Sequence, residues 1–226
     1  MPKSGIDARR QAALKEGSAA YLARREEIIR AAADVFRQQG YEGATLLDVA
    51  KSLGTDRASL YYYIGSKEEL LQEIVRNAIQ NVLEAAETIK RSRAGAPEKI
   101  KALITSMVDN YVENYPYMSI YTQDLGRIAR QESDWATDVI DRTRRYEAVV
   151  RAVLAKGQKD GTVRSDVPVD LIALSLFGMI NWMHRWHRPD FKFSADQIAD
   201  SFTKIYLEGS ATDLGVEAIG GRSKSA

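Results

Sequence analysis

Residues 45–64 read TLLDVAKSLGTDRASLYYYI, and this stretch decides the fold. Apolar residues recur at helical spacing on both sides of a break at Gly54, and the leading threonine stands where an N-cap is needed. Two short helices joined by a glycine-containing turn are the ingredients of a helix-turn-helix. Ala50 is small where the two helices must pack closely, and Leu60 and Ile64 can close a small core. The stretch therefore predicts a helix-turn-helix.

The second of these helices has a polar face. Arg57, Ala58, Tyr61 and Tyr62 lie at i, i+1, i+4 and i+5, on the side away from the apolar residues. A guanidinium and two phenols on one exposed face can enter a major groove, hydrogen-bond phosphates and contact base edges. This pattern indicates that the segment binds DNA.

The chain outside this stretch also predicts helices. Apolar residues recur every three or four positions, and the runs end at glycine or proline. The expected further helices cover about residues 21–40, 67–91, 97–114, 116–129, 135–157, 169–187 and 195–209. No alternation is long enough to build a sheet. We expect an all-α protein of about nine helices, with an N-terminal helix-turn-helix domain and a C-terminal helical domain.

Domain boundaries follow from these runs. The expected parts are a basic leader at 1–20, a helix-turn-helix domain at 21–67, a ligand-binding and dimerisation domain at 68–210, and a tail rich in Gly, Ser and Ala at 211–226. A leader of this kind can act as an arm in the minor groove, and the alternative is a leader that makes no contact.

Composition excludes several classes of protein. The 226 residues include no cysteine, so there is no disulfide framework, thiolate zinc site or cysteine nucleophile. The net charge is +1, from 32 basic and 31 acidic residues, which excludes a uniformly basic nucleic-acid binder. No apolar run reaches the roughly 18–20 residues that a membrane span needs, and the N-terminus has no secretory signal pattern. We expect a cytoplasmic protein without membrane association.

The region 25–71 resembles the N-terminal domain of the TetR family of bacterial transcriptional regulators. The combination of LYYYI at 60–64 with SKEEL at 66–70 is the specific part. The other matching residues are Ile28, Ala32, Phe36, Gly40, Tyr41, Ala44, Thr45, Asp48, Val49, Ala50, Leu53 and Gly54. The resemblance implies an all-helical homodimer with a C-terminal domain that binds a small molecule. It also implies a repressor that leaves its palindromic operator when the ligand binds.

The resemblance also assigns DNA contacts. The residues concerned are Thr45, Arg57, Ser59, Tyr61, Tyr62, Tyr63 and Lys67. The threonine and the lysine would each meet a phosphate, and the three tyrosines would pack on the sugar-phosphate backbone. Arg57 and Ser59 are the candidates for base contacts. Two alternatives stay open: the three tyrosines 61–63 belong to the domain core, and Lys67 is a solvated lysine in the first turn of its helix.

An aromatic and methionine-rich set predicts a ligand pocket within residues 97–187. Its expected lining is Met107, Tyr111, Tyr121, Trp182, Arg185 and Trp186, with Trp182 and Trp186 on one helical face. The segments YTQDLGRIARQ at 121–131 and NWMHRWHRPD at 181–190 are similar to a TetR subgroup that responds to acyl-CoA thioesters in lipid or steroid catabolism. The alternative is that this set is plain core.

A coenzyme A group needs basic partners for its phosphates. The available residues are Arg127, Arg130, Arg144, Arg145 and Arg185. The alternative for Arg144 and Arg145 is pairing with Asp138, Asp141 or Glu147 on their own helix.

The last two expected helices carry more apolar residues than one packed face of each helix can bury. These are Leu171, Ile172, Leu174, Leu176, Ile180, Ile198, Phe202, Ile205, Tyr206 and Leu207. Burial between two copies accounts for the surplus, so we expect a homodimer.

Two other functions are alternatives to a DNA-binding regulator: an enzyme and a helical interaction module. An enzyme has little support, because the chain has no GxSxG elbow, phosphate-cradling loop or HExxH. A helical interaction module would not need exposed tyrosines and an arginine on a two-turn helix. The only histidines, His184 and His187, are spaced i, i+3 without enough further ligands, so neither a metal nor a cofactor is expected.

Overall fold

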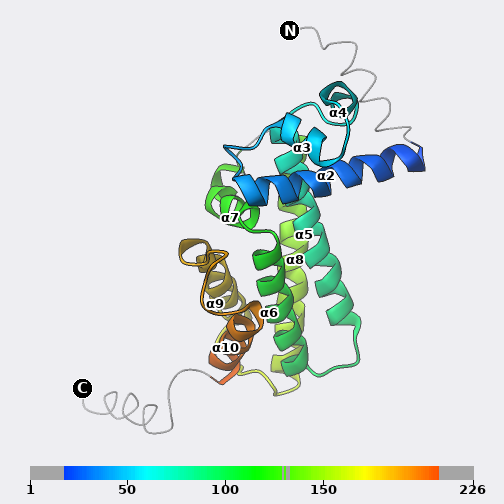
Figure 1. The fold of residues 1–226 in the computed structure, drawn as a ribbon. Coiled ribbons are helices and arrows are strands. Elements are labelled where there is room, and N and C mark those ends of the chain that lie inside the picture. The colour runs from blue at the N-terminus through cyan, green and yellow to red at the C-terminus, as the bar shows by residue number, and fades with distance from the viewer. Residues whose placement is uncertain (1–17, 129, 131–132, 209–226) are drawn as a thin grey trace. The chain divides into compact units, whose positions relative to one another are not determined.

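The computed structural model describes residues 18–128, 130 and 133–208, and over these residues the protein is all-helical (Figure 1). The elements are α2 (Ala19–Gln39), α3 (Leu46–Ser52), α4 (Arg57–Tyr63), α5 (Lys67–Arg91), α6 (Ala96–Glu113), α7 (Tyr117–Ile128), α8 (Asp134–Lys159), α9 (Val169–Asn181), the 3₁₀ helix η1 (Trp182–Arg185) and α10 (Ala195–Glu208). The described part thus contains nine α-helices, which confirms the expected fold class. Within it, no helix combines the length and the apolar character that crossing a membrane requires.

Local signals set the helix ends. The side chain of Ser18 accepts a hydrogen bond from the Tyr21 amide, so α2 begins two residues earlier than expected. Gly40 has φ 76°, a left-handed conformation that favours glycine, and α2 ends immediately before it. Ser66 Oγ accepts a hydrogen bond from the Glu69 amide at 3.0 Å, and Glu69 Oε2 accepts from the Gly65 amide at 2.9 Å. The expected start of α5 is therefore confirmed.

The chain divides into two compact units. The first comprises Met1–Leu83 with Glu113–Arg144, and the second comprises Glu84–Val112 with Arg145–Ala226. Helices α5, α6 and α8 run from one unit into the other. The boundary expected after residue 67 separates a DNA-binding part from a ligand-binding part. Because it concerns function and not compactness, it stays a prediction. The expected tail and most of the expected leader lie outside the described residues.

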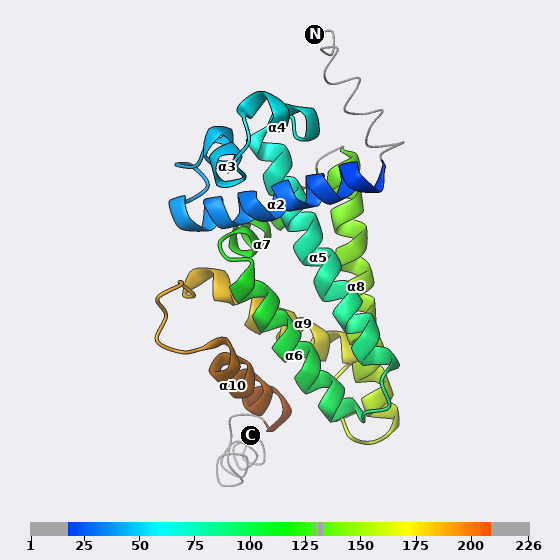
Figure 2. The same cartoon turned by 45° about the vertical axis from the view of Figure 1, so that its right-hand side comes forward.

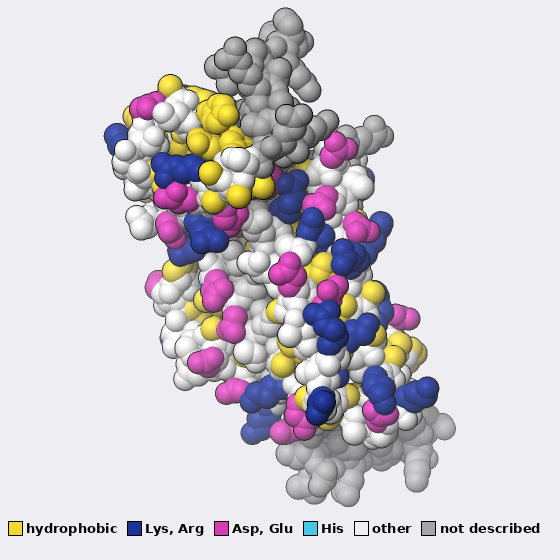
Figure 3. Space-filling model, turned by 90° about the vertical axis from the view of Figure 1, so that its right-hand side faces the viewer, with side chains coloured by type: hydrophobic (Ala, Val, Ile, Leu, Met, Phe, Trp, Pro, Cys, Tyr) yellow, Lys and Arg dark blue, Asp and Glu magenta, His cyan; other side chains and the backbone are white. Residues whose placement is uncertain are grey.

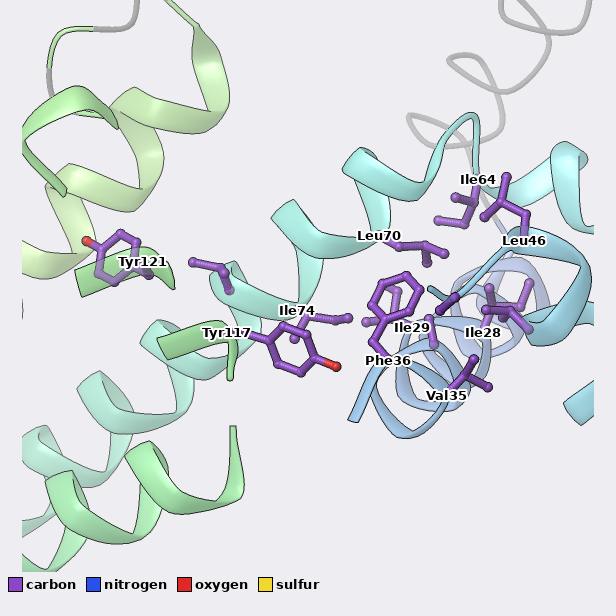
Figure 4. Close-up of a cluster of buried hydrophobic side chains, with 14 of the residues drawn as sticks. Ile28, Ile29, Val35, Phe36, Leu46, Ile64, Leu70, Ile74, Tyr117 and Tyr121 are labelled. Atoms are coloured by element: carbon purple, nitrogen blue, oxygen red, sulfur yellow. The ribbon is translucent and has the colours of Figure 1, made fainter. Parts of the chain in front are cut away.

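In the first unit, α3 and α4 lie together against α2 (Figures 1 and 2). Phe36 is fully buried beneath them, and Figure 4 shows it turned toward Leu70 and Ile74 of α5. The Tyr117 hydroxyl of α7 donates a hydrogen bond to the Ala33 carbonyl of α2 at 2.9 Å, and burial raises the pKa of this phenol. Burying a side chain such as Phe36 contributes about 1.5–3 kcal/mol, so this core fixes the helix-turn-helix on α5 and α7.

A chain of charged side chains joins α2, α5 and α8 within the first unit, and we call it the ion-pair chain. Its members are Arg25, Glu69, Glu73, Arg76, Asp138 and Arg142. The Arg25 guanidinium lies 3.3 Å from both Glu69 and Glu73, and its side chain is only 12% exposed. Burial alone would lower the pKa of Arg25, but the two carboxylates raise it, so the guanidinium stays charged.

In the second unit, α10 packs against α9. The Tyr206 hydroxyl donates to the Ile172 carbonyl at 2.8 Å, and burial raises the pKa of Tyr206 to about 12. Four large apolar side chains nevertheless remain between 41% and 57% exposed on these helices: Leu171, Leu174, Ile205 and Leu207. Three of them line a cavity of about 480 Å³. We call these four residues the α9–α10 apolar face.

The helix expected at 169–187 is shorter than the sequence indicated. α9 ends at Asn181, and the chain tightens into η1, where the amides of Trp186 and His187 both donate to the Met183 carbonyl. Such 3₁₀ turns are frequent at helix C-termini. The tighter turn leaves Met183 fully buried and Trp182 59% exposed. Trp182 and Trp186 therefore do not share one helical face.

Candidate nucleic-acid interface

Helix α3 begins with a reciprocal capping box. The Asp48 amide donates to Thr45 Oγ1 at 3.2 Å, and the Thr45 amide donates to Asp48 Oδ2 at 3.0 Å. The Thr45 hydroxyl also donates to Asp48 Oδ2 at 2.6 Å. The hydrogen bonds from the side chain and the backbone of Thr45 lower the pKa of Asp48. Thr45 is thus exposed at the helix start in one fixed rotamer.

Helix α4 is capped by Asp56 in a similar way. The Ser59 amide donates to Asp56 Oδ1 at 2.8 Å, and the Ser59 hydroxyl donates to Oδ2 at 2.7 Å. These two hydrogen bonds lower the pKa of Asp56, so the cap is a carboxylate at neutral pH. Asp56 is not among the residues expected from the sequence, although an aspartate three residues before a serine at a helix start is an ordinary capping signal.

The exposed Arg57 and the half-buried Tyr61 form a pair on α4. Arg57 Nη2 donates to the Tyr61 hydroxyl at 2.7 Å, and the guanidinium carbon lies 5.3 Å from the centre of the Tyr61 ring. Because Tyr61 accepts this bond, its own hydroxyl proton is available to an outside acceptor such as a phosphate.

The three tyrosines of α4 differ in their surroundings. Tyr62 is 45% exposed, whereas Tyr61 and Tyr63 are half-buried. Tyr63 stacks on Tyr21 of α2 with ring centres 4.9 Å apart, and Tyr62 meets the same ring edge-on at 5.6 Å. This buried contact of Tyr21 is not predictable from the sequence, because a lone aromatic residue in the first turn of a helix is just as common in an ordinary core. Packing against α2 fits the alternative in which Tyr63 belongs to the core.

Lys67 begins α5, and its ammonium points at the α2–α3 connector. Nζ lies 2.7 Å from the Tyr41 carbonyl oxygen, 3.2 Å from that of Ala44 and 3.3 Å from that of Glu42. It also lies 4.4 Å from the centre of the Tyr41 ring. Lys67 is therefore a half-buried, fully hydrogen-bonded group and not a solvated lysine.

The charges on the surface are mixed. On the face shown in Figure 3, basic and acidic side chains alternate without forming one basic patch. This distribution agrees with the net charge of +1. DNA binding by such a protein depends on a few well-placed groups more than on a strong overall field.

The residues expected to line a ligand pocket are divided between the units. Tyr121 belongs to the first unit, where its hydroxyl shares a 2.7 Å hydrogen bond with Thr143. Met107 and Tyr111 are buried in the second unit, and the Tyr111 ring lies 5.9 Å from that of His187. The other three lie near the end of α9: Trp182 and Arg185 stack on each other at the surface, and Trp186 is half-buried.

Trp186 lines a cavity of about 540 Å³ in the second unit. The other lining residues are Phe191, Phe193, Gln197, Ile198, Asp200, Ser201 and Phe202. The Trp186 ring is 5.0 Å from Phe191 and 6.3 Å from Phe202. Burial, with a smaller effect of Arg188, lowers the pKa of the neighbouring His187. No cluster of three or more histidines and carboxylates suited to a metal occurs among the described residues.

The arginines considered for coenzyme A phosphates differ in their surroundings. Arg145 pairs with Glu87 of α5 at 3.2 Å, so the alternative of pairing on its own helix is wrong for this residue. Glu147 instead pairs with Arg151 at 3.3 Å. Arg144 is exposed, and the side chain of Arg127 lies outside the described part of the chain.

A helical protein with a capped helix-turn-helix and an exposed Arg–Tyr face is a DNA-binding regulator of the helix-turn-helix class. Comparison with protein families gives the same result. Residues 28–74 match the family described as bacterial regulatory proteins of the tetR family, and residues 93–210 match the tetracyclin repressor-like C-terminal domain. The chain belongs to the TetR family of transcriptional regulators. These are regulators and not enzymes, so the enzyme and interaction-module alternatives no longer hold.

Several individual proteins are similar along most of the chain. The HTH-type transcriptional repressor KstR2 of Rhodococcus jostii is 27% identical over 190 residues, covering 84% of this chain and 92% of that protein. The crystal structure of the TetR family regulator PfmR from Thermus thermophilus has a TM-score of 0.69 and 31% identity, covering 82% of this chain and 99% of that one. The structure of the ketosteroid transcriptional regulator KstR2 of Mycobacterium tuberculosis has a TM-score of 0.68 and 26% identity, with coverages of 84% and 96%.

Proposed function

We propose that this regulator is a dimeric repressor that leaves a palindromic operator when it binds a small apolar or acyl-CoA-like effector. The observation that carries the proposal is the exposed face of α4, where Arg57, Ser59 and Tyr61 are held by partners on their own helix or cap. It acts in the cytoplasm, where a bacterial operator lies. Relatives that are repressors, KstR2 among them, support repression of transcription over activation.

The proposed DNA contacts follow from this geometry. Arg57 and Ser59 read base edges, because they are exposed near the start of α4. Thr45, Tyr61 and Tyr62 meet the sugar-phosphate backbone. Tyr63 supports them from the side of Tyr21.

Dimerisation is supported by the α9–α10 apolar face. Leu171 and Leu174 lie about one helical turn apart on α9, and Ile205 lines the same cavity as Leu171. Contiguous apolar surface of this kind marks an interface between proteins. A second copy presenting the same face would bury it and bring two recognition helices onto one operator.

The effector site is proposed in the second unit. Tyr146 of α8 is 7% exposed and has no hydrogen-bond partner for its hydroxyl among the described residues. An unpaired buried hydroxyl costs about 1–3 kcal/mol, and an effector carbonyl would satisfy it. Trp186 and its aromatic neighbours line a separate, open cavity whose volume is within the range of small-molecule sites, and Tyr146 is not among its lining residues. One relative is named a ketosteroid transcriptional regulator, and another is named a fatty acid metabolism regulator protein; these names favour a steroid-derived or fatty acyl effector.

Effector binding would release the protein from DNA through the helices that contribute residues to both units. α5 begins beside the helix-turn-helix and ends in the second unit, and α8 also contributes to both. An effector that favours the non-binding conformation by about 2.7 kcal/mol shifts the equilibrium a hundredfold.

A titration of effectors tests this proposal. The wild-type protein should shift DNA flanking its own gene in a gel, and a steroid-derived or fatty acyl-CoA thioester should reverse the shift while free coenzyme A should not. The variant Tyr146→Phe should bind the same DNA equally well but need about two- to tenfold more thioester, the equivalent of one hydrogen bond. Tyr206→Phe is the matched control, because the Tyr206 hydroxyl already bonds Ile172. Equal release of both variants would contradict the Tyr146 assignment.

Arg57 provides a second test of the DNA interface. Arg57→Ala should lower operator affinity by roughly 1–3 kcal/mol and relax the preference at one base pair, while binding to random DNA changes much less. Arg30→Ala removes an exposed arginine of α2 and serves as the control. An unchanged ratio of operator to random binding in Arg57→Ala would show that Arg57 does not read a base.

A further inference from the structure

The ion-pair chain runs without a gap from α2 to α8. Glu73 of α5 is shared between two cations: Arg25 of α2, at 3.3 Å, and Arg76, which lies one turn further along α5. Asp138 of α8 is shared in the same way, at 3.0 Å from Arg76 and 2.8 Å from Arg142. The two carboxylates and the arginine between them therefore form one path of alternating charge from α2 over α5 to α8.

Arg76 is the middle of this path, because it serves carboxylates on two different helices. Its Nη1 donates to Glu73 of α5, and its Nε donates to Asp138 of α8. If Asp138 moves away, Arg76 has only Glu73 left and neutralises more of its charge. Glu73 then attracts Arg25 less strongly, since the two arginines compete for one carboxylate. The position of α8 thus affects the strength of the contact between α2 and α5.

The path is partly withdrawn from water. The exposed fraction of the side chain is 13% for Glu73, 28% for Arg76 and 35% for Asp138. Charges in such positions are screened much less by solvent and salt than charges on the open surface. A change at Asp138 can therefore be felt at Arg25, although three ion pairs separate the two residues.

The α8 end of the path lies on the helix that carries the proposed effector contact. Asp138, Arg142 and Tyr146 are spaced four residues apart, so they lie along one side of α8. Tyr146 follows Asp138 by two helical turns, about 12 Å along the axis. Because a regular helix is stiff over two turns, an effector that displaces α8 at Tyr146 also displaces Asp138.

We propose that the ion-pair chain carries the effector signal from α8 to α2. Asp138 is a positioning residue, which acts through Arg76 and Glu73 on the contact of Arg25 with α5. Helices α3 and α4 pack on α2, so a weaker contact between α2 and α5 changes how the recognition helix is held. The inference rests on the proposed function, including the effector contact at Tyr146, and names the route by which that contact controls DNA binding.

A double-mutant cycle tests the coupling without DNA or effector. Arg25→Met removes the α2 end of the path, and Asp138→Asn removes the charge at the α8 end while keeping the size of the side chain. Urea unfolding gives the unfolding equilibrium constant of the wild type, both single variants and the double variant. The increase caused by Arg25→Met should be at least about threefold smaller in the Asp138→Asn background, because Arg76 already neutralises Glu73 there.

The matched control is Arg30→Met. Arg30 is an exposed arginine of α2 outside the chain, so its loss should have the same effect in both backgrounds. Independent effects of Arg25→Met and Asp138→Asn, multiplying to within about twofold, would overturn the proposal.

A second measurement separates transmission of the signal from effector binding, with oleoyl-CoA as the probe. Equilibrium dialysis should give the same affinity for oleoyl-CoA in Asp138→Asn and in the wild type, since Asp138 lies two turns away from Tyr146. The oleoyl-CoA concentration that releases half of the DNA flanking its own gene should rise at least about tenfold in the variant. Equal binding with equal release would overturn the proposal. A wild type that oleoyl-CoA does not release would contradict the proposed function, and the unfolding cycle would still decide whether α8 is coupled to α2.

Discussion

Replacing Leu174 with glutamate should prevent the proposed dimer from forming and lower operator affinity at least about a hundredfold. The reason is that Leu174 is 55% exposed on the α9–α10 apolar face, where a second copy would cover it. A carboxylate there would have to be desolvated without a partner, which disfavours association. Loss of the second recognition helix then removes the gain from binding two half-sites at once. Light scattering measures the first effect and a gel shift the second.

The control for this experiment is Leu22→Glu. Leu22 is 49% exposed on α2, outside the proposed interface, so its variant should stay dimeric. A Leu174→Glu protein with the mass of a dimer at micromolar concentration would show that the apolar face is not the interface.

Removing the Arg25 side chain should cost about 3 kcal/mol of folding stability. In Arg25→Met, the carboxylates of Glu69 and Glu73 lose the cation that lies between them, although both are largely withdrawn from water. Breaking a buried pair from one side costs about 3–5 kcal/mol, and the lower end applies because Arg76 still faces Glu73. Urea unfolding followed by circular dichroism measures the change in the free energy of unfolding.

Arg30→Met is the matched control on the same helix. Arg30 pairs with Glu26 at 3.3 Å, but its side chain is 77% exposed, so its loss should change stability by less than about 1 kcal/mol. Equal destabilisation by both variants would mean that Arg25 contributes no more than a surface pair.

The sequence predicted the helix-turn-helix well because its signals are local. Thr45 caps α3, Gly40 follows the end of α2, and Ser66 caps α5, each through contacts within a few residues. The spacing of apolar residues then placed the core, since Phe36 and Leu60 are both fully buried as expected.

Contacts between distant residues could not be read from the sequence. The bond from Lys67 to the Tyr41 carbonyl spans 26 positions, and the stacking of Tyr21 on Tyr63 spans 42. The end of α9 was also missed, because WMHR has no glycine or proline and the tightening into η1 accompanies the burial of Met183. The expected pocket lining assumed that α9 continues to residue 187. Because α9 ends at Asn181, Trp182 faces outward instead.

The caps of α3 and α4 have a consequence for how this regulator could change its preferred sequence during evolution. The hydroxyls of Thr45 and Ser59 are each tied to an aspartate, and the guanidinium of Arg57 is tied to Tyr61. These rotamers are set before DNA arrives, so the proposed contacts of these side chains with DNA would avoid about 0.5–1.5 kcal/mol of ordering cost each. A new residue at position 57 would still lie beside Tyr61, and a new residue at position 59 would still lie beside Asp56, although neither partner suits the new side chain. Altered operators should therefore arise through paired changes, with Arg57 and Tyr61 drifting together and Ser59 together with Asp56.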